Sequence, residues 1–169
     1  DGAGEQISNS DLNTQLENVN AYSFNLDFKK NENEHLIYYG AEAIYNRVNS
    51  WGNTFDIANE IHATSAARYP TSDWAVFSLY FKYSKKINTK TTFTSGVRAN
   101  SYHLKSNFSS QNSFYSLPFN EVKVNKQAAN GIVGISHRSK LWEIKSNLST
   151  GFRAPNVDDV GKIFDFQEG

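Results

Sequence analysis

The sequence predicts an all-β fold, an antiparallel up-and-down meander of about six strands. Apolar and polar residues alternate along six segments, which is the period of a strand with one apolar face. Aromatic residues make up 14% of the chain, and aromatic runs with little Leu favour pleated sheets over helices. No segment has the spacing of a convincing amphipathic helix.

The alternation defines each expected strand in turn. In the first strand, at 21–29, Tyr22, Phe24, Leu26 and Phe28 share one face. The same pattern returns at 37–46, 75–84, 93–100, 129–136 and 142–153. Residues 1–20 are polar and rich in Asn and Glu, so we expect them to form a lead-in loop. The chain from 21 to 169 is then expected to be one unit built from strands.

The connections between these strands alternate in length. Short polar connections occupy 29–35, 84–90 and 138–141, whereas long ones occupy about 50–73 and 105–127. Structureless loops above about 12–15 residues are unusual in compact soluble domains. Outer-membrane barrels, in contrast, have short periplasmic turns and long extracellular loops. The alternation therefore favours part of a transmembrane β-barrel.

Three tryptophans near strand ends agree with that interpretation. They are Trp51, Trp74 and Trp142. An indole at such a position can sit in an aromatic girdle between lipid and water. Three tryptophans at the rim of a soluble sandwich would give the same pattern, and the alternating connections favour the girdle.

Charge and composition exclude several classes of protein. Lys+Arg and Asp+Glu both total 17, and a chain without a basic surplus is unsuited to nucleic acid. There is no Cys for disulfides or thiolate metal sites. Met is absent as well, so we expect the chain to be part of a longer one. No apolar run approaches the roughly 18 residues of a transmembrane helix.

No constellation of catalytic residues is found, so we expect neither an enzyme nor a cofactor. The four His are scattered, and none pairs at metal-ligand spacing. Glu60 and His62 lie two residues apart in a long connection, where a solvated pair is the simpler interpretation. No phosphate loop, nucleophile elbow or zinc helix motif occurs.

Four short motifs follow one another along the chain. They are Tyr39-Gly40-Ala41-Glu42, Arg68-Tyr69-Pro70, Gly96-Val97-Arg98, and Gly151-Phe152-Arg153-Ala154-Pro155-Asn156 with Asp158 and Asp159 behind it. In this order they resemble motifs of TonB-dependent outer-membrane receptors, in which a strand ending in "TGFRAPN" emerges into an external loop. The resemblance covers about 21–169 and disfavours a porin-type barrel without TonB.

The resemblance implies a bacterial outer-membrane protein in which these strands form about a quarter of a barrel of about 22 strands with a plugged lumen. It implies TonB-energised uptake of a large scarce solute, such as an iron–siderophore complex, haem or cobalamin. The implied partners are outer-membrane lipid, the TonB complex acting through a plug domain that this chain lacks, and the small-molecule or metal-chelate ligand.

A second interpretation belongs to a different class, a soluble β-sandwich that binds carbohydrate or mediates adhesion. Such a sandwich would bury its apolar face under a second sheet about 10 Å away. A barrel wall would show that face to lipid. Cut from its neighbours, a six-stranded sheet has two open edges, so we also expect the isolated chain to self-associate.

The first group of candidate functional residues stands at the polar positions of the alternating strands. Glu42, Lys82, Arg98, Lys145 and Arg153 are expected to face the lumen. They form either a plain water-facing wall or a docking surface for the plug. If Arg153 is buried there, its charge requires a partner such as a plug carboxylate.

The second group lies in the expected long loops. It contains Trp51, Phe55, Tyr69, Phe114 and Tyr115. Exposed aromatic side chains in loops suit the capture of a chelate or another amphipathic ligand. The same residues could equally pack the loops against themselves.

Overall fold

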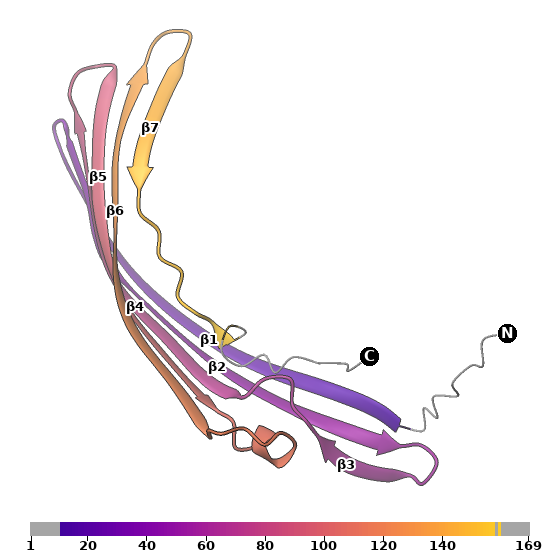
Figure 1. Ribbon diagram of the computed structural model, residues 1–169. Coiled ribbons are helices and arrows are strands. Elements are labelled where there is room, and N and C mark those ends of the chain that lie inside the picture. The colour runs from indigo at the N-terminus through magenta and orange to yellow at the C-terminus, as the bar shows by residue number, and fades with distance from the viewer. Residues whose placement is uncertain (1–10, 158, 160–169) are drawn as a thin grey trace.

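The computed structural model describes residues 11–157 and 159. They form one antiparallel sheet that is strongly curved and therefore has a concave and a convex face (Figure 1). The strands are β1 (Asp11–Glu32), β2 (His35–Asp56), β3 (Ile61–Ser65), β4 (Thr71–Lys86), β5 (Thr91–Asn107), β6 (Glu121–Arg138) and β7 (Glu143–Ser149), with the 3-10 turn η1 (Gln111–Ser113) before β6. Their order is β1-β2-β4-β5-β6-β7, and β3 pairs with the end of β2. The predicted antiparallel meander is confirmed.

Pairing aligns the alternating residues of neighbouring strands, so the sheet has two different faces. Leu26 pairs with Ala41, and Leu79 lies opposite Ala41 on the next strand. These residues lie on the convex outer face, where Leu79 is 52% and Phe24 62% exposed. Among the described residues no second sheet covers this face. The fold is therefore that of a barrel wall, and the sandwich is not supported.

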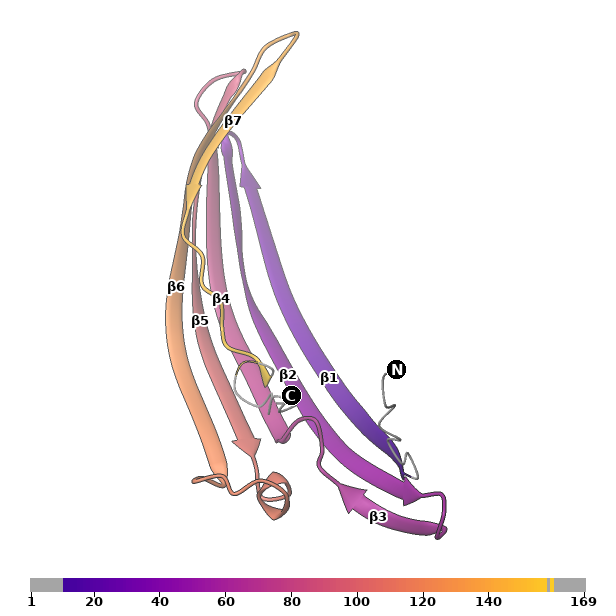
Figure 2. The same cartoon turned by 45° about the vertical axis from the view of Figure 1, so that its right-hand side comes forward.

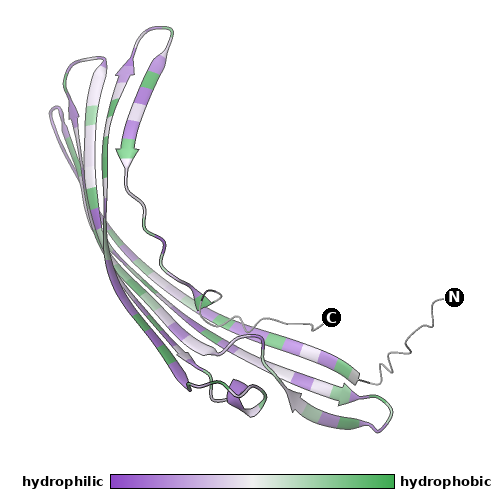
Figure 3. Cartoon of the chain, in the orientation of Figure 1, coloured by the Kyte–Doolittle hydropathy of each residue, from purple (hydrophilic) through white to green (hydrophobic). Residues whose placement is uncertain are grey.

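The apolar residues of the outer face form a band that we call the apolar belt. On β2 it runs from Ile37 to Tyr45, and on β4 from Ala75 to Tyr83. Each stretch extends about 27 Å along its strand, or about 20 Å along the barrel axis at a tilt of about 40°. This height is close to the ~25 Å band of outer-membrane barrels. Hydropathy alternates along the strands in the same way (Figure 3).

The strands continue beyond the belt on the side of the long connections, which corrects the predicted boundaries. Residues 11–20, predicted as loop, belong to β1 and pair with 47–56 of β2, while residues 1–10 lie outside the described part. The connection from β2 to β4 is only 57–70, and β3 within it folds back on β2 (Figure 2). The connection from β5 to β6 is likewise 108–120. Backbone pairing continues here although the alternation seen in the belt is lost.

The last strand ends earlier than its alternation predicts, at Ser149 and not at 153. The Thr150 amide still donates to the Gly131 carbonyl at 3.0 Å. The Gly131 amide, however, donates to the Thr150 side-chain hydroxyl at 2.9 Å, and the Thr150 carbonyl accepts from Asn130 Nδ2 at 3.3 Å. Because a side chain takes the place of the backbone acceptor, the ladder stops and the chain turns onto the concave side.

The three tryptophans predicted to form an aromatic girdle do not share one face of the sheet. Trp142 lies by the belt, with its ring 5.5 Å from that of His137. Trp74 instead shares the face of Tyr102 on the concave side and meets its ring edge-on at 6.0 Å. Trp51 lies on the extension of β2, six residues past Tyr45.

No helix in the described part of the chain is long and apolar enough to cross a membrane.

Candidate functional site on the inner wall

Polar side chains on the concave inner face form a network across four strands. Arg98 Nη2 donates to the Glu42 carboxylate and, at 2.9 Å, to Ser78 Oγ, while Arg98 Nε donates to Asn100 Oδ1 at 2.9 Å. Ser78 Oγ donates to Asn100 Oδ1 at 2.9 Å, and Asn100 Nδ2 donates to Asn130 Oδ1 at 3.1 Å. The network thus joins β2, β4, β5 and β6 through one charged pair.

A second contact lies beside this network and depends on a glycine. Tyr80 reaches over Gly40 and donates its hydroxyl to the Asp27 carboxylate of β1. A Cβ atom at position 40 would lie 2.7 Å from the Tyr80 hydroxyl oxygen. The Tyr39-Gly40-Ala41-Glu42 motif therefore has two roles in this wall, since its glycine leaves room for Tyr80 and its Glu42 accepts from Arg98.

Of the five residues predicted to face the lumen, four share the inner face of the sheet without forming one cluster, namely Glu42, Lys82, Arg98 and Lys145. Glu42 and Arg98 pair with each other, with side chains 25% and 40% exposed. Lys82 lies in register with Gly96, one position along that face from Arg98. Lys145 lies on the last strand, where its Nζ is 3.5 Å from a Glu143 oxygen. The choice between a water-facing wall and a docking surface stays open.

The segment after β7 lies over the inner face (Figure 1), where Tyr102 donates its hydroxyl to the Pro155 carbonyl. Arg153 is outside any strand, and its Nη2 donates to the two Asp159 oxygens at 2.8 and 3.1 Å. Asn156 and Asp159 exchange side-chain and backbone hydrogen bonds, both at 2.9 Å. A carboxylate of the same motif, that of Asp159, thus lies beside Arg153.

The remaining motif residues have no comparable contacts. Phe152 is 41% exposed, and Gly151 has open space where a Cβ would be. Ala154 lies between Arg153 and Pro155 and is half-buried. Asp158 lies outside the described residues.

A hollow of about 410 Å³ lies between this segment and the wall. It is lined by Glu17, Val19, Asn46, Val48, Tyr69, Trp74, Asn156 and Val157. The lining combines two aromatic rings and aliphatic side chains with a carboxylate and two amides. Such a mixture suits a small amphipathic molecule. The alternation of residues predicted neither this hollow nor the role of Trp74 in it.

The structure does not gather the five predicted loop aromatics. Trp51 and Phe55 belong to β2, and Phe55 stacks on His62 with ring centres 4.5 Å apart. Tyr69 lies beside Arg68, whose guanidinium is 5.3 Å from its ring, and is the only one of the five that lines the hollow. Phe114 and Tyr115 follow η1 and are about half exposed.

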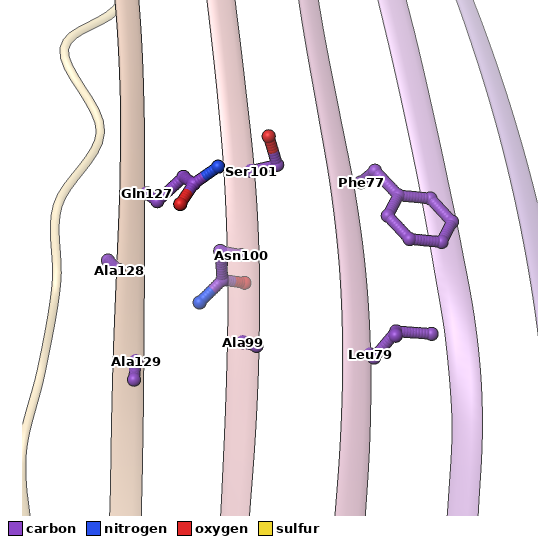
Figure 4. A pocket seen from close by; sticks show the side chains of 8 residues that line it. All are labelled: Phe77, Leu79, Ala99, Asn100, Ser101, Gln127, Ala128 and Ala129. Carbon is purple, nitrogen blue, oxygen red and sulfur yellow. The ribbon is translucent and has the colours of Figure 1, made fainter.

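Another hollow, of about 400 Å³, belongs to the outer face. Phe77 and Leu79 of β4 border it on one side, and small residues of β5 and β6 such as Ala99 and Ala129 form its floor (Figure 4). Its position in the apolar belt separates it from the lumen.

Within residues 11–157 and 159, no three His, Asp or Glu side chains are grouped so that they could hold a metal ion.

Comparison with known proteins supports the fold. No family model matches the chain, and no curated protein matches it either. Among solved structures, it is similar to the copper transporter OprC, with a TM-score of 0.72 at 10% identity over 85% of this chain. The chain spans 22% of the length of that transporter. The likeness therefore shows the fold alone, a curved antiparallel sheet like part of a barrel wall.

Proposed function

We propose that the chain is part of the barrel of a TonB-dependent receptor in a bacterial outer membrane, which imports a large scarce solute. The observation that carries the proposal is the inner-wall network, where Gly40, Glu42 and Arg98 of two family-like motifs meet at one place. The polar inner face and apolar outer face support a membrane setting. An iron–siderophore complex, haem or cobalamin is the proposed class of solute.

The fold neighbour is named as a copper transporter. Cu(I) prefers soft sulfur ligands. This chain has neither Cys nor Met, so it contributes no such ligand. Copper nevertheless belongs among the solutes to be tested.

The test is an uptake assay in the source bacterium with and without the gene for this protein. Labelled ferric siderophores, haem, cobalamin and copper are each supplied at scarce concentration, in cells that contain or lack TonB. We expect one solute to enter only when both the protein and TonB are present. Uptake that needs the protein but not TonB would contradict the energy source, and no dependence for any solute would contradict the proposal.

A further inference from the structure

The end of the sheet that carries the short turns is strongly basic. The three segments 29–35, 82–90 and 138–145 contain nine Lys or Arg residues and three Glu, although the whole chain contains 17 basic and 17 acidic residues. More than half of the basic residues therefore lie at one end of a neutral chain. An excess of this size attracts an anionic surface.

The apolar belt ends close to the short turns, whereas at the opposite end of the sheet the strands continue far beyond the belt. Ile37 and Tyr83, the last belt residues of β2 and β4, are each two positions from His35 and Lys85. In the other direction β2 continues from Tyr45 to Asp56. Two positions correspond to about 7 Å along a strand. The basic residues of the turn end thus lie at the height of lipid headgroups.

Two of these basic residues, Lys30 and Lys85, cluster with His35, Tyr83 and Glu32 on the outer face. His35 pairs directly with Lys85, and its Nδ1 lies 2.6 Å from the Tyr83 hydroxyl. Lys30 lies on the same face of β1 and its Nζ is 2.8 Å from Glu32. Within the described part of the chain, Lys85 has no carboxylate within ion-pair distance. The two ammonium groups, the imidazole and the phenol can donate to a phosphate, and Lys85 is the ammonium that Glu32 does not already hold.

A trough leads from this cluster into the apolar belt. Phe93 of β5 lies opposite Lys85, and beyond it the outer face of β5 carries the small residues Ser95, Ala99 and Ser101. Val97 stands between Ser95 and Ala99 and is 63% exposed, but Gly131 of β6 beside it has no side chain. Two hollows, of about 520 and 400 Å³, follow one another along this line beneath the larger side chains of β4. Ser95 to Ser101 measures about 20 Å along the strand. This length is comparable with one leaflet of a core about 30 Å thick.

We propose that one anionic phospholipid docks on the outer face, with its phosphate at Lys30, His35, Tyr83 and Lys85 and one acyl chain in the trough. Basic charge at headgroup height and an apolar trough that starts beside it point to a lipid and not to a soluble anion. The inference rests on the membrane setting of the proposed function. It goes beyond that function because it assigns a specific lipid site to the short-turn end.

The experiment measures lipid binding to the intact protein in detergent by native mass spectrometry. Phosphatidylglycerol and phosphatidylcholine with the same acyl chains are compared as probes. Because one basic residue near the surface is worth about a fivefold preference for anionic lipid, the unchanged protein should prefer phosphatidylglycerol by more than about fivefold. The double variant Lys30→Gln/Lys85→Gln should lose most of this preference.

The matched control is Lys82→Gln/Lys145→Gln, which removes two charges at the same end but on the inner face. It should keep the preference. Ala99→Phe, which fills the trough, should weaken binding of both lipids and leave their ratio unchanged. Equal loss in the two double variants, or no preference in the unchanged protein, would overturn the lipid site. Solute uptake is a separate readout, so a receptor that imports its solute without this preference would overturn the inference alone.

Discussion

At Gly40 the absence of a side chain lets two others meet. Tyr80 and Asp27 come from strands that are separated by β2, and the Tyr80 ring must cross β2 at this glycine. The nearest atoms to an added Cβ are the Leu26 carbonyl oxygen and the Tyr80 ring and hydroxyl. The Leu26 backbone oxygen is the nearest of these atoms, so a larger residue would strain the ladder between β1 and β2 as well as the Tyr80–Asp27 contact.

Gly40→Ala should therefore destabilise the folded protein by about 1–3 kcal/mol, the usual cost of overpacking. The measurement is urea unfolding of the protein in detergent, followed by tryptophan fluorescence. Gly151→Ala is the matched control, because open space surrounds position 151. It should change stability by less than about 0.5 kcal/mol. Equal effects of the two alanines would show that position 40 is not crowded by the Leu26 backbone and the Tyr80 side chain.

At the scale of the strand, the two faces should respond differently to the same charge. Leu79 lies in the middle of the outer face and is 52% exposed. Leu79→Arg should cost about 2–4 kcal/mol in a bilayer, as for lipid-facing arginines near the midplane. Asn25→Arg is the inner-face control, because Asn25 lies opposite Glu42 and is exposed. Ser78 is unsuitable for this purpose, since it is fully buried in the Arg98 network.

The two variants are compared by chemical unfolding in lipid vesicles. The expected order is the unchanged protein and Asn25→Arg close together, and Leu79→Arg clearly less stable. If both arginines destabilise to the same extent, the outer face does not contact lipid, and the assignment of the two faces is wrong.

The middle of each strand was predictable from sequence, but its ends were not. Inside the belt one face meets an apolar environment, so residues such as Phe77 and Leu79 alternate with polar ones and reveal both strand and face. Between 11 and 20 no such contrast exists, so this first part of β1 was not predicted. The end of β7 depends on the Thr150 hydroxyl, which competes for a backbone amide. The alternation of apolar and polar residues does not show where a side-chain hydroxyl will replace a backbone acceptor.

The candidate site was predictable only in part for a similar reason. Parity places Glu42 and Arg98 on one face, as the structure confirms, but it cannot tell which residues pair across strands. The contact from Tyr80 to Asp27 skips a strand and requires the registers of two ladders at once. The position of Pro155 beside Tyr102 depends on how the chain folds after its last strand, which alternation does not describe.

At the scale of the whole molecule, the two ends of the sheet differ in length and charge. We expect the turn near Asn88 to face the periplasm and the connection near Asn59 to face the outside, as in outer-membrane barrels. Single variants Asn59→Cys and Asn88→Cys are suited to the test, because the chain has no other Cys. An impermeant maleimide added to whole cells should label position 59 only. Labelling at 88 but not at 59 would reverse the orientation.

The last prediction concerns the behaviour of this chain alone in water. Its sheet has two open edges, one at β1 and one at β7. The second edge continues along β6, which begins at Glu121 but pairs with β7 only from Ile132. Its outer face exposes Phe24, Phe77 and Leu79. Open edges recruit other strands and large apolar patches recruit other surfaces, while six strands are fewer than the roughly eight of the smallest bacterial barrels.

The isolated chain should therefore sediment as a dimer or a larger assembly in detergent-free buffer, and detergent should dissociate it by covering the apolar belt. Leu79→Arg, which places a charge in the middle of that belt, should shift the distribution toward smaller species. The distribution of monomers and larger assemblies is measured by sedimentation velocity at several protein concentrations. A monomer with a cooperative thermal transition at all concentrations would contradict the prediction, because it would require the outer face to be covered within one chain.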